Sequence, residues 1–181
     1  MSNEVLFSQE SIQKRVRELA CEISRDYDGS ELLVVGVLKG AYIFMADLVR
    51  ALTVSCRMDF IRVSSYGSQT ESSGSVQITK DIEMSMDGRN VLVVEDIVDT
   101  GLTLRYIVDI FTARNPKSIK VCAFLDKRKR RKIPFEADYV GFTMDDGFVV
   151  GYGLDYNEEY RYLPDVCTLE AGSGRMQEGR K

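Results

Sequence analysis

Two short, almost purely apolar runs limit what this chain can fold into. They cover residues 32–38 and 91–94. Runs of this length are typical of strands that are buried on both faces, and they are far too short to cross a membrane. Around them, apolar residues recur at helical spacing over residues 8–26, 41–52 and 103–114. Buried strands that alternate with helices predict an α/β fold with a mainly parallel sheet.

Weaker patterns predict the remaining elements. Further strands are expected at residues 58–65, 77–80, 119–125, 137–144 and 148–154. Residues 64–75 are rich in serine and glycine and almost free of apolar side chains, which predicts a mobile loop. The polar, glycine-rich residues 171–181 predict a flexible tail that follows a single domain over residues 1–170.

Composition and charge indicate the setting of the protein. The net charge of −4 over 181 residues does not favour a polyanionic partner. The first residues lack the basic start and the apolar stretch of a signal peptide, so we expect a cytoplasmic protein without a membrane partner. The four cysteines are widely scattered and form no Cys-x-x-Cys pair, which predicts free structural thiols.

The chain contains no histidine, and this absence restricts its chemistry. It excludes Ser-His-Asp and Cys-His hydrolases and the usual histidine-based zinc sites. A general acid or base must then be Asp, Glu, Lys, Tyr or Cys. A bound metal is expected to be a hard cation held by carboxylates.

Residues 91–103 carry the clearest chemical signal. A buried strand leads through Glu95 and Asp96 into a Thr-Gly-x-Thr turn that opens a helix. Ligands of α/β sheets gather at such strand ends, and the positive end of a helix favours phosphate. Hydroxyl donors from Thr100 and Thr103, with Gly101 between them, suit a phosphate, and the acid pair suits magnesium. The plainer alternative is a solvated acidic turn that caps a helix.

The whole of residues 91–103 resembles the signature of the type I phosphoribosyltransferase family. The order is the same: four apolar residues, two acids, two apolar residues and then the phosphate turn. Residues 37–42 and 148–158 are similar to the corresponding segments of the hypoxanthine–guanine branch, and the resemblance covers roughly residues 5–170. It implies a mainly parallel sheet flanked by helices, with a small hood formed by the terminal segments. No nucleotide P-loop is present, and the glycines of residues 151–156 match a dinucleotide fingerprint only weakly.

The resemblance implies specific roles for individual residues. Phosphoribosyl pyrophosphate is expected to bind Lys39, Gly40, Glu95, Asp96, Asp99, Thr100, Gly101, Leu102, Thr103 and Arg161. The purine is expected to bind Lys127, Phe148, Val149 and Asp155. Magnesium is expected to bind Glu95 and Asp96, and a second magnesium to bind Asp155. Ser65 and Tyr66 would open a lid loop, and a cis peptide bond would join Leu38 to Lys39.

The implied reaction transfers a phosphoribosyl group to N9 of hypoxanthine or guanine, giving IMP or GMP and pyrophosphate, with Asp99 as general base. Two alternatives stay open: a regulator of the same fold that binds the ligand without turnover, and a magnesium-dependent phosphatase. The basic run 127–132 is a candidate nucleic-acid contact, but it is short and lacks aromatic residues. Apart from Lys127, we expect its side chains to be solvated or to contact a neighbouring subunit. A homo-oligomer, dimer or tetramer, is also expected.

Overall fold

The computed structural model describes residues 4–66 and 75–169, and its main feature is a six-stranded sheet. The strand order is β4-β3-β2-β5-β6-β7. The pairs from β3 through β7 are parallel, and only β4 runs antiparallel to its neighbour. The bounds are β2 Leu32–Leu38, β3 Cys56–Tyr66, β4 Ser75–Lys80, β5 Asn90–Val98, β6 Ser118–Lys127 and β7 Tyr139–Met144. The predicted α/β fold with a mainly parallel sheet is therefore confirmed.

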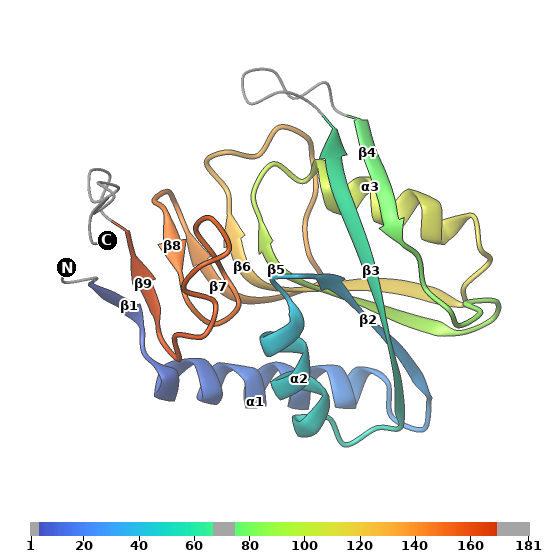
Figure 1. Cartoon of the computed structure of the whole chain (residues 1–181). Coiled ribbons are helices and arrows are strands. Elements are labelled where there is room, and N and C mark those ends of the chain that lie inside the picture. The colour runs from blue at the N-terminus through green and yellow to red at the C-terminus, as the bar shows by residue number, and fades with distance from the viewer. Residues whose placement is uncertain (1–3, 67–74, 170–181) are drawn as a thin grey trace, which may run out of the picture.

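Helices cover both faces of this sheet (Figure 1). Helices α1 (Gln9–Asp26) and α2 (Tyr42–Ala51) pack on one face, and α3 (Leu102–Thr112) packs on the other. The Ser8 hydroxyl caps α1 by accepting a hydrogen bond from the Ser11 N–H at 3.3 Å. All three helices lie where the apolar spacing predicts them, to within two residues at each end.

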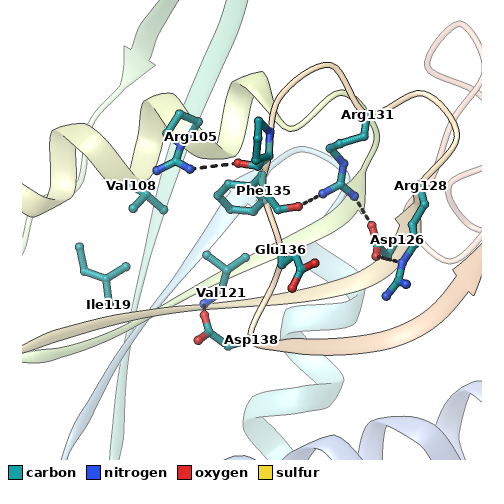
Figure 2. Close-up of a pocket in the computed structure, with 11 residues that line it drawn as sticks. Arg105, Val108, Ile119, Val121, Asp126, Arg128, Arg131, Phe135, Glu136 and Asp138 are labelled. Carbon is teal, nitrogen blue, oxygen red and sulfur yellow. Dashed lines mark hydrogen bonds and ion pairs between the residues drawn. The ribbon is translucent and has the colours of Figure 1, made fainter.

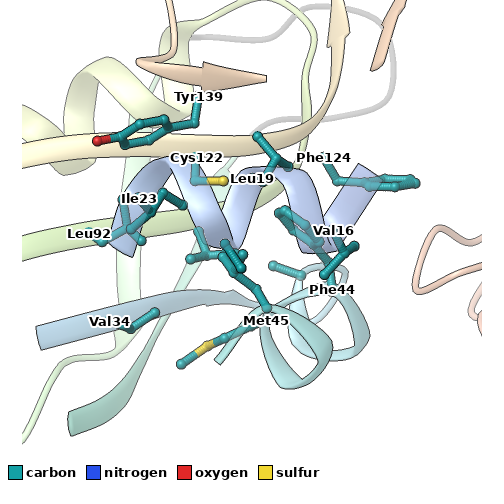
Figure 3. Close-up of a cluster of buried hydrophobic side chains, with 14 of the residues drawn as sticks. Val16, Leu19, Ile23, Val34, Phe44, Met45, Leu92, Cys122, Phe124 and Tyr139 are labelled. Carbon is teal, nitrogen blue, oxygen red and sulfur yellow. The ribbon is translucent and has the colours of Figure 1, made fainter. Parts of the chain in front are cut away.

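Alternation along the central strands separates two hydrophobic clusters. In β2, Leu32 and Val34 face α1 and α2, whereas Leu33 and Val35 face α3. Figure 3 shows the first cluster, in which side chains of α1 and α2 meet those of β2, β5 and β6. Burial on both faces explains why these strands read as continuous apolar runs.

A second, three-stranded antiparallel sheet joins the two ends of the described chain (Figure 1). Its order is β1 (Val5–Phe7), β9 (Val166–Thr168) and β8 (Val149–Val150). This sheet is the small hood that the family resemblance implies. The residue pattern does not predict β1 or β9, because strands of three residues are too short to show a periodicity.

The strand predicted over residues 148–154 is wrong beyond its first residues. Strand β8 ends at Val150, and the chain then turns with positive φ at Gly151 (99°), Tyr152 (50°) and Gly153 (99°). A positive φ is incompatible with an extended strand. The predicted loop 64–75 is also shorter than expected, since β3 continues to Tyr66 and β4 begins at Ser75. The rest of that loop and the predicted tail, residues 171–181, lie outside the described residues.

Aromatic side chains attach the hood to the main sheet. Phe7 stacks on Phe142 of β7 with 4.2 Å between ring centroids. Tyr152 packs against Phe124 of β6 at 4.9 Å, and its hydroxyl donates to Asp47 Oδ2 of α2 at 2.7 Å. All four cysteines are free thiols, as predicted. Among the described residues, no helix combines the length and apolar character needed to span a membrane.

Replacing Phe124 with alanine should destabilise the protein strongly. Phe124 is 1% exposed and its ring contacts those of Phe44, Phe142 and Tyr152. We expect the free energy of unfolding to fall by about 3–5 kcal/mol, measured by urea denaturation followed by circular dichroism. Met58→Ala is the control, because its half-exposed side chain should contribute no more than about 0.5 kcal/mol. Equal losses in the two variants would contradict this account of the core.

Candidate functional site

The candidate site lies at the carboxyl edge of the parallel sheet. Strands β2, β5 and β6 are parallel neighbours, so their C-terminal ends reach the same edge. Lys39 and Gly40 follow β2, residues 99–103 follow β5, and Lys127 ends β6. The sheet thereby brings together residues that are almost 90 positions apart in the sequence.

The phosphate turn, residues 99–103, connects β5 to α3. Gly101 occupies the N-cap position with φ 85°, in the left-handed region that glycine adopts without strain. Gly101 has no side chain to cap the helix, and the Leu102 N–H makes only a long hydrogen bond to Thr100 Oγ1, at 3.4 Å. The N–H groups of Thr103 and Leu104 donate to no acceptor among the described residues, so they can bind a ligand. The turn lines a cavity of about 130 Å³ together with Glu95 and Asp96. Its geometry fits the predicted phosphate site.

Glu95 and Asp96 lie inside β5, which extends four residues beyond the predicted strand. Burial and the neighbouring carboxylate of Asp96 raise the pKa of Glu95, and burial raises that of Asp96. Among the described residues, neither acid takes part in an ion pair. The Arg161 guanidinium acts in the opposite direction on the pKa of Asp96 without pairing with it. Two adjacent acids that lack an ion-pair partner favour a bound cation.

Lys39 and Gly40 form a loop that lies directly against Asp96. The Leu38–Lys39 peptide bond is cis, as the resemblance implies. A side chain at Gly40 would collide with the Asp96 carboxylate, and one at Gly153 would collide with the Gly40 carbonyl. Lys39, Gly40 and Asp96 line a cavity of about 290 Å³. Glu95, Asp155 and Arg161 line it as well.

Basic and acidic side chains from the segment after β8 complete this cavity. Arg161 pairs with Asp155 at 2.9 Å and donates to the Gly153 carbonyl at 2.7 Å, and its buried Nε has no hydrogen-bond partner among the described residues. Lys39 pairs with Glu158 at 2.8 Å. Two cations therefore stand at the cavity, and a site with two cations suits an anionic ligand. One of them, Arg161, keeps a donor that no described residue engages.

Asp99 stands at the start of the phosphate turn. Its Oδ2 pairs with Arg130 at 3.2 Å. Its Oδ1 is buried and accepts no hydrogen bond from the described residues. A buried carboxylate oxygen without a donor is costly, and it is suited to accept a proton from a ligand.

The residues expected to bind the purine gather beyond β6 and β7. Lys127 is 5% exposed, and its Nζ donates to the Gly147 carbonyl. Burial lowers its pKa, while the Asp99 carboxylate acts in the opposite direction. Phe148 is 49% exposed and meets Tyr156 edge to face, so its ring is available for stacking instead of filling the core. Val149 lies buried in β8, directly after it.

Two sequence expectations fare differently in the structure. Ser65 and Tyr66, expected to open a lid, form the end of β3 and pair with β4, while residues 67–74 lie outside the described part of the chain. The expectation of a solvated basic run after Lys127 is wrong for Arg131. Its side chain is 16% exposed because its guanidinium bonds to buried carbonyl and carboxylate oxygens. Arg130 is exposed but ion-paired to Asp99.

Comparison with known proteins identifies the family. The model of the phosphoribosyl transferase domain matches residues 2–157. The chain belongs to the phosphoribosyl transferase family. It is 52% identical to the hypoxanthine-guanine phosphoribosyltransferase of Bacillus subtilis over 92% of both chains, and 50% identical to that of Aquifex aeolicus over 92% of this chain and 94% of the relative. A hypoxanthine-guanine phosphoribosyltransferase crystal structure from Bacillus anthracis superposes with a TM-score of 0.90 at 47% identity, covering 94% of this chain and all of that one.

Some residues of this phosphoribosyl transferase site escape sequence reasoning. Gly153 lies within the quoted motif, but only the fold shows that it packs on Gly40. Glu158 also lies in that motif, and its pairing with Lys39 spans 119 positions. Asp126 and Arg131 sit behind the phosphate turn, and no local pattern marks them.

Proposed function

We propose that the protein transfers the 5-phosphoribosyl group from phosphoribosyl pyrophosphate to N9 of hypoxanthine or guanine. The products are IMP or GMP and pyrophosphate, as expected of a purine salvage enzyme. The observation that carries the proposal is the meeting, at one sheet edge, of a phosphate turn, a buried acid pair and a lysine that ends β6. The relatives named hypoxanthine-guanine phosphoribosyltransferase support this choice of substrates.

Each part of the substrates has a partner of matching chemistry in this arrangement. The 5′-phosphate takes the N–H groups and hydroxyls of the phosphate turn. The pyrophosphate takes Lys39, the Gly40 backbone and Arg161, whose free Nε supplies a donor. The purine stacks on Phe148, presents its edge to the Val149 backbone, and offers its 6-oxygen to Lys127.

Asp99 acts as the general base in this proposal. As the bond from the ribose carbon to pyrophosphate breaks, positive charge develops on the ribose, and purine N9 attacks that carbon. Oδ1 of Asp99, which lacks a donor in the described structure, accepts the proton from N7 of the purine. Arg130 holds the other oxygen at 3.2 Å and so orients the carboxylate.

Magnesium is the proposed cofactor, with Glu95 and Asp96 as candidate ligands of one ion and Asp155 as a candidate ligand of a second. The acid pair fits a hard dication, because neither carboxylate has an ion-pair partner in the described part of the chain and Arg161 acts on Asp96 only from a distance. No three acids among the described residues lie close enough to hold one ion by themselves. Pyrophosphate oxygens and water would therefore complete its shell, as is usual for this metal. When bound, magnesium neutralises charge on the leaving pyrophosphate.

The proposal also covers the surroundings of the enzyme. Its four free thiols agree with a reducing, cytoplasmic setting. We propose that it assembles as a homo-oligomer, a dimer or a tetramer. We propose that neither a membrane nor a nucleic acid is its partner. Size-exclusion chromatography with light scattering measures the subunit count.

Replacing Asp99 with asparagine should lower turnover roughly 10²–10⁴-fold, since an amide cannot take the purine proton. Binding of phosphoribosyl pyrophosphate should largely persist, because the rest of the phosphate turn is unchanged. Steady-state kinetics and calorimetry measure the two effects separately. Asp109→Asn, on the exposed face of α3, is the control. Near-normal turnover of the Asp99 variant would remove this residue from the base role.

Chelation should abolish activity, and added magnesium should restore it. The raised pKa of Glu95 means that this acid takes up a proton at a higher pH than an ordinary glutamate. Because the protonated form binds a cation poorly, the magnesium concentration for half-maximal activity should increase as the pH falls. Titrating magnesium at several pH values measures this dependence. Full activity in excess chelator would overturn the metal assignment.

The enzyme should use 6-oxopurines and essentially ignore adenine. The Lys127 ammonium only donates hydrogen bonds, so it suits the 6-oxygen and opposes the amino group of adenine. Leaving such buried polar groups without partners yields discrimination on the order of 10⁴ or more. Lys127→Gln should reduce this preference, because an amide also accepts. The measurement is pyrophosphate release with each base, and comparable efficiency with adenine in the native protein would refute this role of Lys127.

A further inference from the structure

The phosphate turn has a back side, formed by residues 128–135. This segment leaves β6 and packs against the turn from behind (Figure 2). A Cβ placed on Gly101 would lie 3.1–3.2 Å from side-chain atoms of Arg131, Ile133 and Phe135. The packing at this point is therefore tight. A groove of about 600 Å³ borders the contact, between α3 and β6.

Arg131 uses its whole guanidinium group at this contact. Its Nε donates to the Asp99 carbonyl at 3.1 Å. One terminal nitrogen donates to the Phe135 carbonyl, and the other pairs with the Asp126 carboxylate (Figure 2). Asp126 is 5% exposed and stands opposite Val98 in the β5–β6 register. The guanidinium thus connects the end of β6 to the main chain of the phosphate turn.

A second bond repeats this connection one residue later. The Lys132 N–H donates to the Thr100 carbonyl at 3.0 Å. In a trans peptide the carbonyl and the following N–H point in opposite directions. Holding the carbonyls of Asp99 and Thr100 at the back therefore directs the N–H groups of Thr100 and Gly101 to the front. Neither of these N–H groups donates a backbone hydrogen bond to the described residues.

We propose that Arg131 is a positioning residue for the phosphate turn. It fixes the Asp99 peptide so that the N–H groups of the turn converge on the 5′-phosphate and the Asp99 side chain starts from a fixed backbone. The turn needs this support, because its N-cap residue, Gly101, has no side chain and the only side-chain bond at this end among the described residues is the long one from the Leu102 N–H to Thr100 Oγ1, at 3.4 Å. The inference rests on the proposed function for its substrate. The orientation of the N–H groups of the turn can nevertheless be tested by ligand binding, without catalysis.

Arg128 provides a matched control. It pairs with the same carboxylate, Asp126, at 3.1 Å, but its side chain is 71% exposed and it makes no hydrogen bond to the phosphate turn. Lysine is the informative substitution at both positions. It keeps the positive charge beside Asp126 and lacks the planar fork that reaches three acceptors at once.

The test compares Arg131→Lys with Arg128→Lys. Calorimetry with ribose 5-phosphate as the probe reports on the turn alone, and steady-state kinetics give KM for phosphoribosyl pyrophosphate and for hypoxanthine. Arg131→Lys should weaken ribose 5-phosphate binding roughly ten- to a hundredfold, the scale of one hydrogen bond to a charged group. Its KM for phosphoribosyl pyrophosphate should rise similarly, and its KM for hypoxanthine should stay within about twofold. Arg128→Lys should change all three by no more than about twofold.

Three results would overturn the inference. They are native ribose 5-phosphate binding by Arg131→Lys, equal losses in both variants, and a matching rise in KM for hypoxanthine. Thermal unfolding of each variant verifies that it is folded; if Arg131→Lys is not, Arg131→Gln replaces it under the same criteria. A native protein that binds ribose 5-phosphate but releases no pyrophosphate would instead contradict the proposed function, leaving the role of Arg131 to be judged from binding.

Discussion

The parallel alignment of β2, β5 and β6 is the constraint on which the site depends. These strands are in register, with Val35 opposite Val93 and Val93 opposite Val121, and helices cover both of their faces. A sheet buried in this way exposes its chemistry only where the strands end. The Lys39–Gly40 loop, the phosphate turn and Lys127 therefore occupy neighbouring positions on a rigid edge.

Burial at this edge has an electrostatic cost, because it removes water from charged carboxylates. Glu95 and Asp96 continue β5 into a place where water is scarce, so their charged forms are disfavoured. Free donors and acceptors occur nearby, at Arg161 Nε and Asp99 Oδ1. Groups that the protein leaves unsatisfied in its folded state are the groups that a charged substrate and its metal would satisfy. The segment that follows β8 of the hood borders this edge, where Gly153 packs on Gly40.

The sequence predicts what depends on periodicity and on contiguous motifs. The three helices, the central strands and the phosphate turn all leave such a local signal, and Glu95, Asp96 and Asp99 are found beside one another in it. What it misses depends on contacts between distant segments. Strands β1 and β9 exist because they pair with each other across the ends of the described chain. The turn after Val150 follows from left-handed conformations at Gly151 and Gly153. In the sequence, Arg131 is only one charge in a basic run, and its burial is evident only in the folded structure.

The division of the site among separate strand ends has a consequence for how such an enzyme diversifies. In the proposed function, the sugar phosphate binds after β5, while the nucleobase binds at the end of β6 and after β7. If these roles hold, substitutions near Phe148 or Lys127 would alter which base is accepted without changing the N–H groups proposed to hold the phosphate. The residues that bind the sugar phosphate can thus stay unchanged while those around the nucleobase vary. Arg131, which joins Asp126 of β6 to the Asp99 carbonyl, belongs to the sugar-phosphate half although it follows β6 in the chain.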